Sequence, residues 1–148
     1  MTANSDPAYS RVGDIQAVAV VAANSSSQGG GTIGTDIFVA FLADATNGGF
    51  VGELRASLAE STIGTASTAT VMRVFVSSLS AGATTSANTH LIAEVALPSQ
   101  TPSSTVAAVP VVVPINKMIP PGYTILVTNH AAPAANTHWK NVVFGGKY

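Results

Sequence analysis

Hydrophobic and polar positions alternate with a period of two along much of the chain. The pattern is clearest in residues 50–60, where three apolar residues alternate with three polar ones: Leu54, Ala56 and Leu58 against Glu53, Arg55 and Ser57. Residues two apart point to the same face of a β-strand, so this segment predicts a strand with one buried and one solvent-facing side.

Seven other segments have the composition of strands, and loops rich in Gly, Pro, Ser and Asn separate them. They are residues 15–22, 36–43, 68–78, 89–97, 105–115, 123–128 and 137–144. Apolar residues do not recur at spacings of three and four, so we expect no helix. Eight short strands predict an all-β, single-domain antiparallel β-sandwich, and an eight-stranded jelly-roll-like winding is the form expected at this strand count.

Two departures from a regular sandwich are expected. Pro110 and Pro114 cannot donate a backbone hydrogen bond, so the strand predicted over 105–115 should lie at a sheet edge or contain a bulge. Residues 1–14 are polar and contain a proline, which predicts an extended N-terminal arm ahead of a β-sandwich domain of residues 15–148.

The composition indicates a surface that partners cover. Only 9% of the 148 residues are charged, against about 25% in an ordinary domain. No apolar run reaches the roughly 18 residues of a membrane span, and no signal peptide is recognisable, so we expect no membrane partner. Six scattered Lys and Arg residues and a net charge of -1 predict no nucleic-acid partner. The absence of cysteine agrees with synthesis in a cytoplasm.

No motif predicts an enzyme, a metal site or a cofactor. His90, His130 and His138 lack the short spacing and the neighbouring carboxylate of a ligand set. The chain has no Gly-x-Ser-x-Gly elbow, and Gly29-Gly30-Gly31 lacks the lysine of a phosphate loop. We therefore predict a non-enzymatic protein with no catalytic residues and no cofactor.

Four charged residues lie in predicted strands and could pair: Glu53, Arg55, Arg73 and Glu94. Exposed cross-strand ion pairs are the expected arrangement, because opposite charges on neighbouring strands attract one another across the ladder. Ion pairs between subunits are the alternative.

The second half of the chain resembles a group of small tailed-bacteriophage virion proteins. The matching stretches are Val71-Met72-Arg73-Val74-Phe75, Leu91-Ile92-Ala93-Glu94-Val95, Ile119-Pro120-Pro121-Gly122-Tyr123 and Gly145-Gly146-Lys147-Tyr148. Lys147 stands where the group usually has an aspartate, so a role for a carboxylate there does not carry over. The resemblance implies a structural component of the virion, decorating its head, without an active site.

The first functional hypothesis is a capsid decoration or cement protein. It would be made in the host cytoplasm and would stabilise the phage head by covering joints between capsomers. The expected partners are the major capsid protein and further copies of this chain, with a homotrimer as the expected oligomer. Pro7, Tyr9, Arg11 and Val12 are the candidate partner contacts, because a stiff bend, an amphipathic ring and a fork of donors can anchor the arm.

The second hypothesis is a carbohydrate- or receptor-binding jelly roll of a tail fibre or spike. It requires Trp139, Tyr123 or Tyr148 to be exposed, so that the ring can stack on a sugar. The alternative for Trp139, the only tryptophan, is a place in the core or at an interface.

Overall fold

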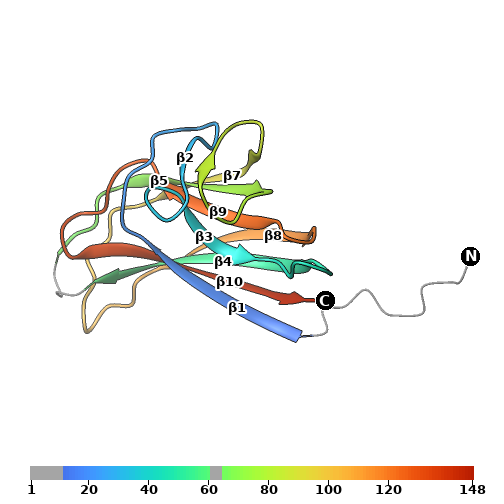
Figure 1. Ribbon diagram of the computed structural model, residues 1–148. Helices are drawn as coiled ribbons and strands as arrows, with labels where there is room; N and C mark the ends of the chain where they lie inside the picture. The colour runs from blue at the N-terminus through green and yellow to red at the C-terminus, as the bar shows by residue number, and fades with distance from the viewer. Residues whose placement is uncertain (1–11, 61–64) are drawn as a thin grey trace, which may run out of the picture.

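Two antiparallel four-stranded sheets pack face to face in the computed structural model, which describes residues 12–60 and 65–148 (Figure 1). These residues form strands and loops and contain no helix, which confirms the all-β sandwich predicted from the alternation. The fold follows from the period of two, because each long strand turns one row of apolar side chains toward the other sheet.

The first sheet, sheet A, has the order β1-β10-β4-β8: β1 (Val12–Val20), β10 (Thr137–Lys147), β4 (Gly49–Glu60) and β8 (Val111–Ile119). Sheet B has the order β3-β9-β5-β7: β3 (Phe38–Leu42), β9 (Thr124–Asn129), β5 (Thr70–Ser77) and β7 (Thr89–Leu97). A small third sheet pairs β2 (Gly31–Thr32) with β6 (Ala83–Thr84). Strands of two residues show no alternation, so the sequence pattern did not predict β2 and β6.

The connections between long strands cross from one sheet to the other, except the one from β5 to β7. Strands β9 and β10, which are neighbours in the chain, therefore lie in different sheets. Strand β10 is inserted between the first strand and β4, with Val18 opposite Asn141 and Asn141 opposite Ala56.

Strand β1 begins at Val12, so Val12, Gly13 and Asp14 of the predicted arm are part of sheet A, paired with Lys147, Gly146 and Gly145 in that order. The rest of the predicted arm, including Pro7, Tyr9 and Arg11, lies outside the described residues.

Strand β8 runs over Val111–Ile119, whereas the sequence predicted residues 105–115. Pro110 cannot donate to a ladder, and it lies just before the strand instead of inside it. The two expected irregularities are both present: β8 is an edge strand, and its register with β4 shifts between Val51 and Glu53. Asn116, which lies on β8 opposite this shift, has a φ of 48°.

The main core lies between sheets A and B. Its largest fully buried side chains include Trp139 and Leu54 from sheet A and Phe41, Met72 and Ile125 from sheet B. The alternation in residues 50–60 is confirmed, since Leu54, Ala56 and Leu58 are buried.

The outer face of sheet B is also covered over β9 and β5, whereas its edge strand β7 is largely exposed. Ile37, Phe75 and Leu126 form a second buried cluster there, beneath the segment that contains β2 (Figure 1). Gly29 packs so closely that a Cβ atom would lie 2.7 Å from Cγ2 of Thr89. Because β9 lies between the main core and this second cluster, all six of its residues are buried. Sheet A has no such cover among the described residues, and this difference defines the first candidate surface.

Candidate interaction surfaces

The uncovered face of sheet A carries two rows of side chains that cross all four strands. We call these eight residues the open face: Ile15, Phe144, Glu53 and Pro114 in one row, and Ala17, Val142, Arg55 and Val112 in the other. The alternate residues Leu54, Val113 and Val143 point into the core and are buried. Six of the eight open-face residues are apolar, whereas a solvated sheet face is normally polar.

An ion pair lies at the centre of the open face. The guanidinium Nη2 of Arg55 donates to Oε1 of Glu53 at 2.6 Å, and its carbon lies 5.3 Å from the ring centroid of Phe144. The stacked ring and the carboxylate hold the guanidinium against the sheet, and the two charges cancel. Lys140 adds a positive charge in the next row, beside Ala19 and Ser57.

The four charged strand residues thus form two separate pairs. Glu53 and Arg55 pair along a single strand, two residues apart, and not across a ladder as expected. Arg73 and Glu94 do pair across the ladder, from β5 to β7, with 2.6 Å between Nε and Oε1. The two pairs belong to different sheets, so the four side chains form no common site.

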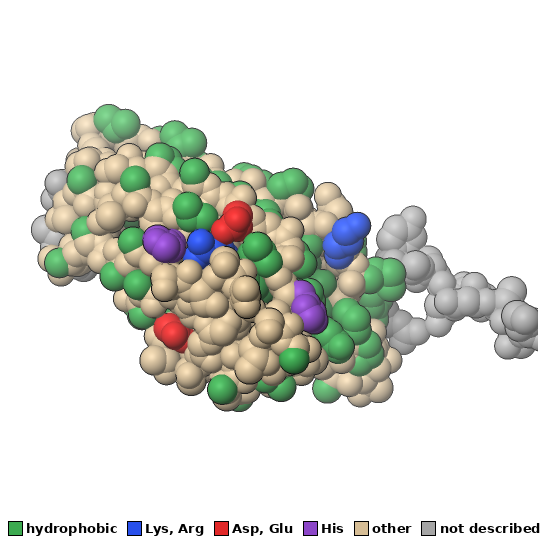
Figure 2. All heavy atoms as spheres, turned by 90° about the horizontal axis from the view of Figure 1, so that it is seen from above, with side chains coloured by type: hydrophobic (Ala, Val, Ile, Leu, Met, Phe, Trp, Pro, Cys, Tyr) green, Lys and Arg blue, Asp and Glu red, His purple; other side chains and the backbone are tan. Residues whose placement is uncertain are grey.

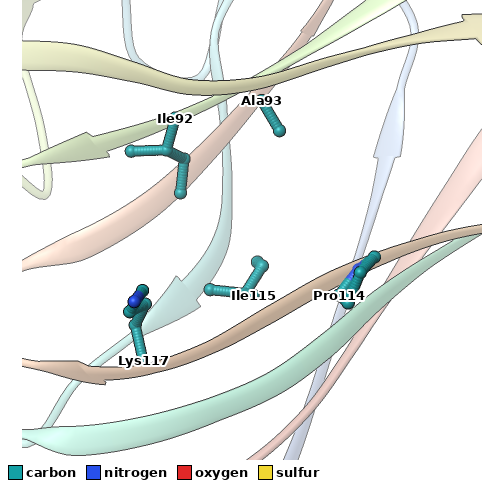
Figure 3. Close-up of a pocket in the computed structure, with 5 residues that line it drawn as sticks. All are labelled: Ile92, Ala93, Pro114, Ile115 and Lys117. Atoms are coloured by element: carbon teal, nitrogen blue, oxygen red, sulfur yellow. The ribbon is translucent and has the colours of Figure 1, made fainter.

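A second uncovered surface lies where the edges of the two sheets approach each other, at β7 and β8. A cavity of about 410 Å³ opens between these strands and is lined by Ile92, Ala93, Pro114, Ile115 and Lys117. We call these five residues the edge cleft. Side chains from the two strands point toward one another across the gap (Figure 3). Ile92 is the extra residue of a bulge, because Phe75 pairs with Leu91 while Val74 pairs with Ala93.

The loop that joins β7 to β8 extends the apolar surface of this edge. Val106 and Val109 in this loop are 67% and 69% exposed. The backbone of Val109 is fixed by two hydrogen bonds with the side chain of Gln100, at 2.9 and 3.1 Å. The backbone N–H of Gln100 in turn donates a hydrogen bond to Oγ of Ser67 at 3.0 Å. The loop therefore presents Val109 to solvent in a defined conformation.

Arg73 occupies a structural position on sheet B. It is nearly buried, and besides Glu94 its guanidinium donates to the carbonyl of Ser25 at 3.3 Å and approaches Nδ1 of His130 at 3.4 Å. One side chain thus joins β5, β7 and the segments that follow β1 and β9.

Charged side chains are sparse on the face seen from above in Figure 2.

The three histidines lie on separate elements: His90 on β7, His130 just after β9 and His138 on β10. Within residues 12–60 and 65–148, no three His, Asp or Glu side chains come together as metal ligands would. The same residues include no helix of the length and apolar character that a membrane crossing requires.

Trp139 points into the main core and is only 1% exposed. Its core position is confirmed, and a role for this ring in stacking on sugars is wrong. Tyr123 is exposed beside the Pro120–Gly122 turn, and Tyr148 is partly buried.

A scan against protein-family models, a search of curated proteins and a search of solved structures each found no match to this chain.

Proposed function

We propose that this protein is a non-enzymatic structural component of a tailed-phage virion, a capsid decoration or cement protein that covers joints between capsomers on the head. The observation that carries the proposal is the presence of two uncovered apolar surfaces, the open face and the edge cleft, which meet at Pro114 on one small sandwich. Uncovered apolar area of this kind is typical of protein interfaces.

Two surfaces match the mechanical task of a cement protein. Such a protein adds stability only by binding, because each contact that exists in the closed shell and not in the open one raises the free energy of opening. It must therefore contact at least two bodies. We assign the edge cleft with Val106 and Val109 to the major capsid protein, and the open face to a second copy of this chain.

We infer a jelly-roll winding from the strand order. Sheets ordered β1-β10-β4-β8 and β3-β9-β5-β7, with connections that cross between them, correspond to two interleaved Greek keys. Viral capsid domains use this winding, and so do lectins. The alternative of a sugar-binding module of a tail fibre loses its strongest residue, since Trp139 is buried.

Electron cryomicroscopy of phage particles purified from the cells in which this protein is made tests the proposal. We expect density for the sandwich at repeated positions over the whole head. Copies confined to the tail tip would favour receptor binding instead, and particles without this protein would overturn the virion role.

A binding assay on heads that lack the protein tests the assigned surface. Replacing Val106 and Val109 with Ser should weaken head binding by about tenfold or more, because two exposed apolar anchors are lost. Val21→Ser is the matched control: Val21 is 60% exposed but lies just after β1. Equal effects of the two changes would contradict the assignment.

A further inference from the structure

We propose that the open face pairs with the open face of a second copy around a two-fold axis, so that the free protein is a dimer built sheet on sheet. The axis would run across the strands, midway between the two rows. The proposal concerns the free protein and does not rest on the virion role, so one can fail while the other stands.

The charges of the open face are self-complementary. Glu53 and Arg55 occupy adjacent outward positions of β4, one in each row. A two-fold axis between the rows exchanges them, so Glu53 faces Arg55 of the second copy and Arg55 faces Glu53 of the second copy. The four charges then form a paired network in which each of them lies beside an opposite charge.

The shapes of the two rows are also complementary under the same rotation. Phe144 comes to lie over Val142 of the second copy, and Ile15 over the small Ala17 of the second copy. A larger side chain thus faces a smaller one, which lets the two faces interdigitate. Antiparallel sheets that pack in this way keep their strands within about 30° of alignment, so the central contacts survive the twist of each sheet.

The open face is prepared for burial. Arg55 is already held by Glu53 and by the ring of Phe144, so little side-chain freedom remains to be lost on association. Four strands about 4.8 Å apart and about 30 Å long give the whole outer side of sheet A, the row of Lys140 included, an area of roughly 600 Å² per copy. Two copies then bury about 1,200 Å², the lower limit of a specific interface, which predicts a reversible dimer.

A two-fold dimer and a trimer need different kinds of interface. A three-fold ring joins two different patches of each subunit, whereas a patch that complements itself closes as a two-fold pair. The trimer expected from the resemblance and this dimer therefore predict different masses for the free protein.

Charge substitutions and sedimentation equilibrium across the micromolar range test the pairing. Glu53→Arg gives a copy with two basic side chains at the axis, and Arg55→Glu gives a copy with two acidic ones. Each variant alone should be monomeric, because four like charges meet. An equimolar mixture should recover the dimer as a one-to-one heterodimer.

Each result supports or overturns the proposal. Wild-type protein that is monomeric or trimeric throughout, single variants that stay dimeric, or a mixture that stays monomeric would overturn it. Circular dichroism of each variant controls for folding, and recovery of the dimer on mixing cannot occur if either variant is unfolded.

An apolar pair of substitutions supplies an independent measurement. Ile15 and Val106 are 66% and 67% exposed, but only Ile15 belongs to the open face. Ile15→Asn should weaken the dimer by about tenfold, and Val106→Asn should leave it unchanged. An unchanged dimer in Ile15→Asn would overturn the proposed interface.

Discussion

Three side chains on the inner faces of the sheets carry buried polar atoms without a hydrogen-bond partner among the described residues. They are Asn129 at both side-chain atoms, Trp139 at Nε1 and Asn141 at Oδ1. Asn24 is buried as well, but its amide donates to the carbonyl of Gly30 at 3.0 Å and accepts from the N–H of Ser26 at 2.8 Å. The cost of burying an amide depends on such bonds, so similarly buried asparagines should respond differently to substitution.

Asn129→Leu should stabilise the protein by about 1 kcal/mol, because it removes two unpaired polar atoms and keeps a side chain that branches at the same carbon. Asn24→Leu should instead destabilise it by about 1–3 kcal/mol, because both bonds are lost. Urea unfolding of the two variants measures the difference. Equal losses in both would contradict the argument.

Asp44 makes stability depend on acidity in a predictable direction. Its Oδ1 accepts the N–H groups of Asn47 at 2.8 Å and Thr46 at 2.9 Å, and these bonds lower the pKa of the carboxyl below 3.8. A lowered folded-state pKa adds stability that is present above pH 3.8 and is lost as the pH falls through the folded value.

Asp44→Asn should therefore remove part of the acid-induced fall in the thermal midpoint below about pH 4, because an amide keeps an acceptor oxygen but does not titrate in this range. Midpoints measured at neutral and acid pH for wild type and variant give the comparison. An identical pH dependence in both would show that the Asp44 turn contributes nothing to it.

At the scale of single residues, the sequence pattern predicted the buried row of residues 50–60, but it was wrong for Arg73, which was expected in an exposed pair and is buried. The inward row of residues 50–60 and the core interpretation of Trp139 followed from alternation and composition. The pairing of Glu53 with Arg55 did not, because a side chain can choose between a neighbour on its own strand and one on the next. The structure adds the ring of Phe144, which lies against the guanidinium of Arg55 while that group pairs with Glu53 on the same strand.

At the scale of elements, strand β10 depends on a bulge at its C-terminal end. The register with β4 shifts between Phe144 and Gly145, and Gly145 then lies against the backbone of Phe50. A Cβ atom at Gly145 would collide with the carbonyl oxygen of Phe50. Glycine is therefore required by close approach of two backbones and not by a turn.

Gly145→Ala should destabilise the protein by about 1–3 kcal/mol, since backbone must move to admit the methyl group. Gly13 lies on the adjacent strand β1 and has no atom within 4 Å of the position of a Cβ, so Gly13→Ala is the matched control and should be near neutral. Thermal unfolding compares them. A neutral Gly145→Ala would mean that the bulge can shift freely.

The bounds of some strands could be predicted from the sequence and those of others could not. Strand β7 has the predicted bounds, Thr89–Leu97. Strand β8 was displaced toward the C-terminus because Pro110 can end a strand as well as interrupt one, and alternation alone does not separate these cases. The open face was missed because it needs the order of strands in the sheet, which residues far apart in the chain determine.

At the scale of the whole molecule, the two sheets differ in how well they are shielded. The central strands of sheet B, β9 and β5, are enclosed between the main core and the second cluster, whereas sheet A is covered on one side by the described residues. The free energy needed to open a segment locally is higher where that segment buries more apolar surface. Backbone amides should therefore differ in protection according to sheet and not only according to hydrogen bonding.

Hydrogen exchange should be slowest in β9 and β5, the central strands of sheet B, and faster in the edge strands β1 and β8 of sheet A. Peptide-resolved mass spectrometry on the variant Arg55→Glu removes any contribution from association through the open face. Slower exchange in β1 than in β9 would contradict the argument that burial on both faces of a strand slows its local opening.

The insertion of β10 between β1 and β4 has a consequence for synthesis on the ribosome. Among the strands of residues 12–60 and 65–148, β1 is hydrogen-bonded in sheet A to β10 alone, and residues 21–136 are translated between them. At about 5–20 residues per second, β1 waits on the order of ten seconds for its partner. During that time the unpaired backbone and the apolar side chains of β1 are available to chaperones and to other nascent chains. We expect the yield of native protein to depend on how this waiting strand is protected.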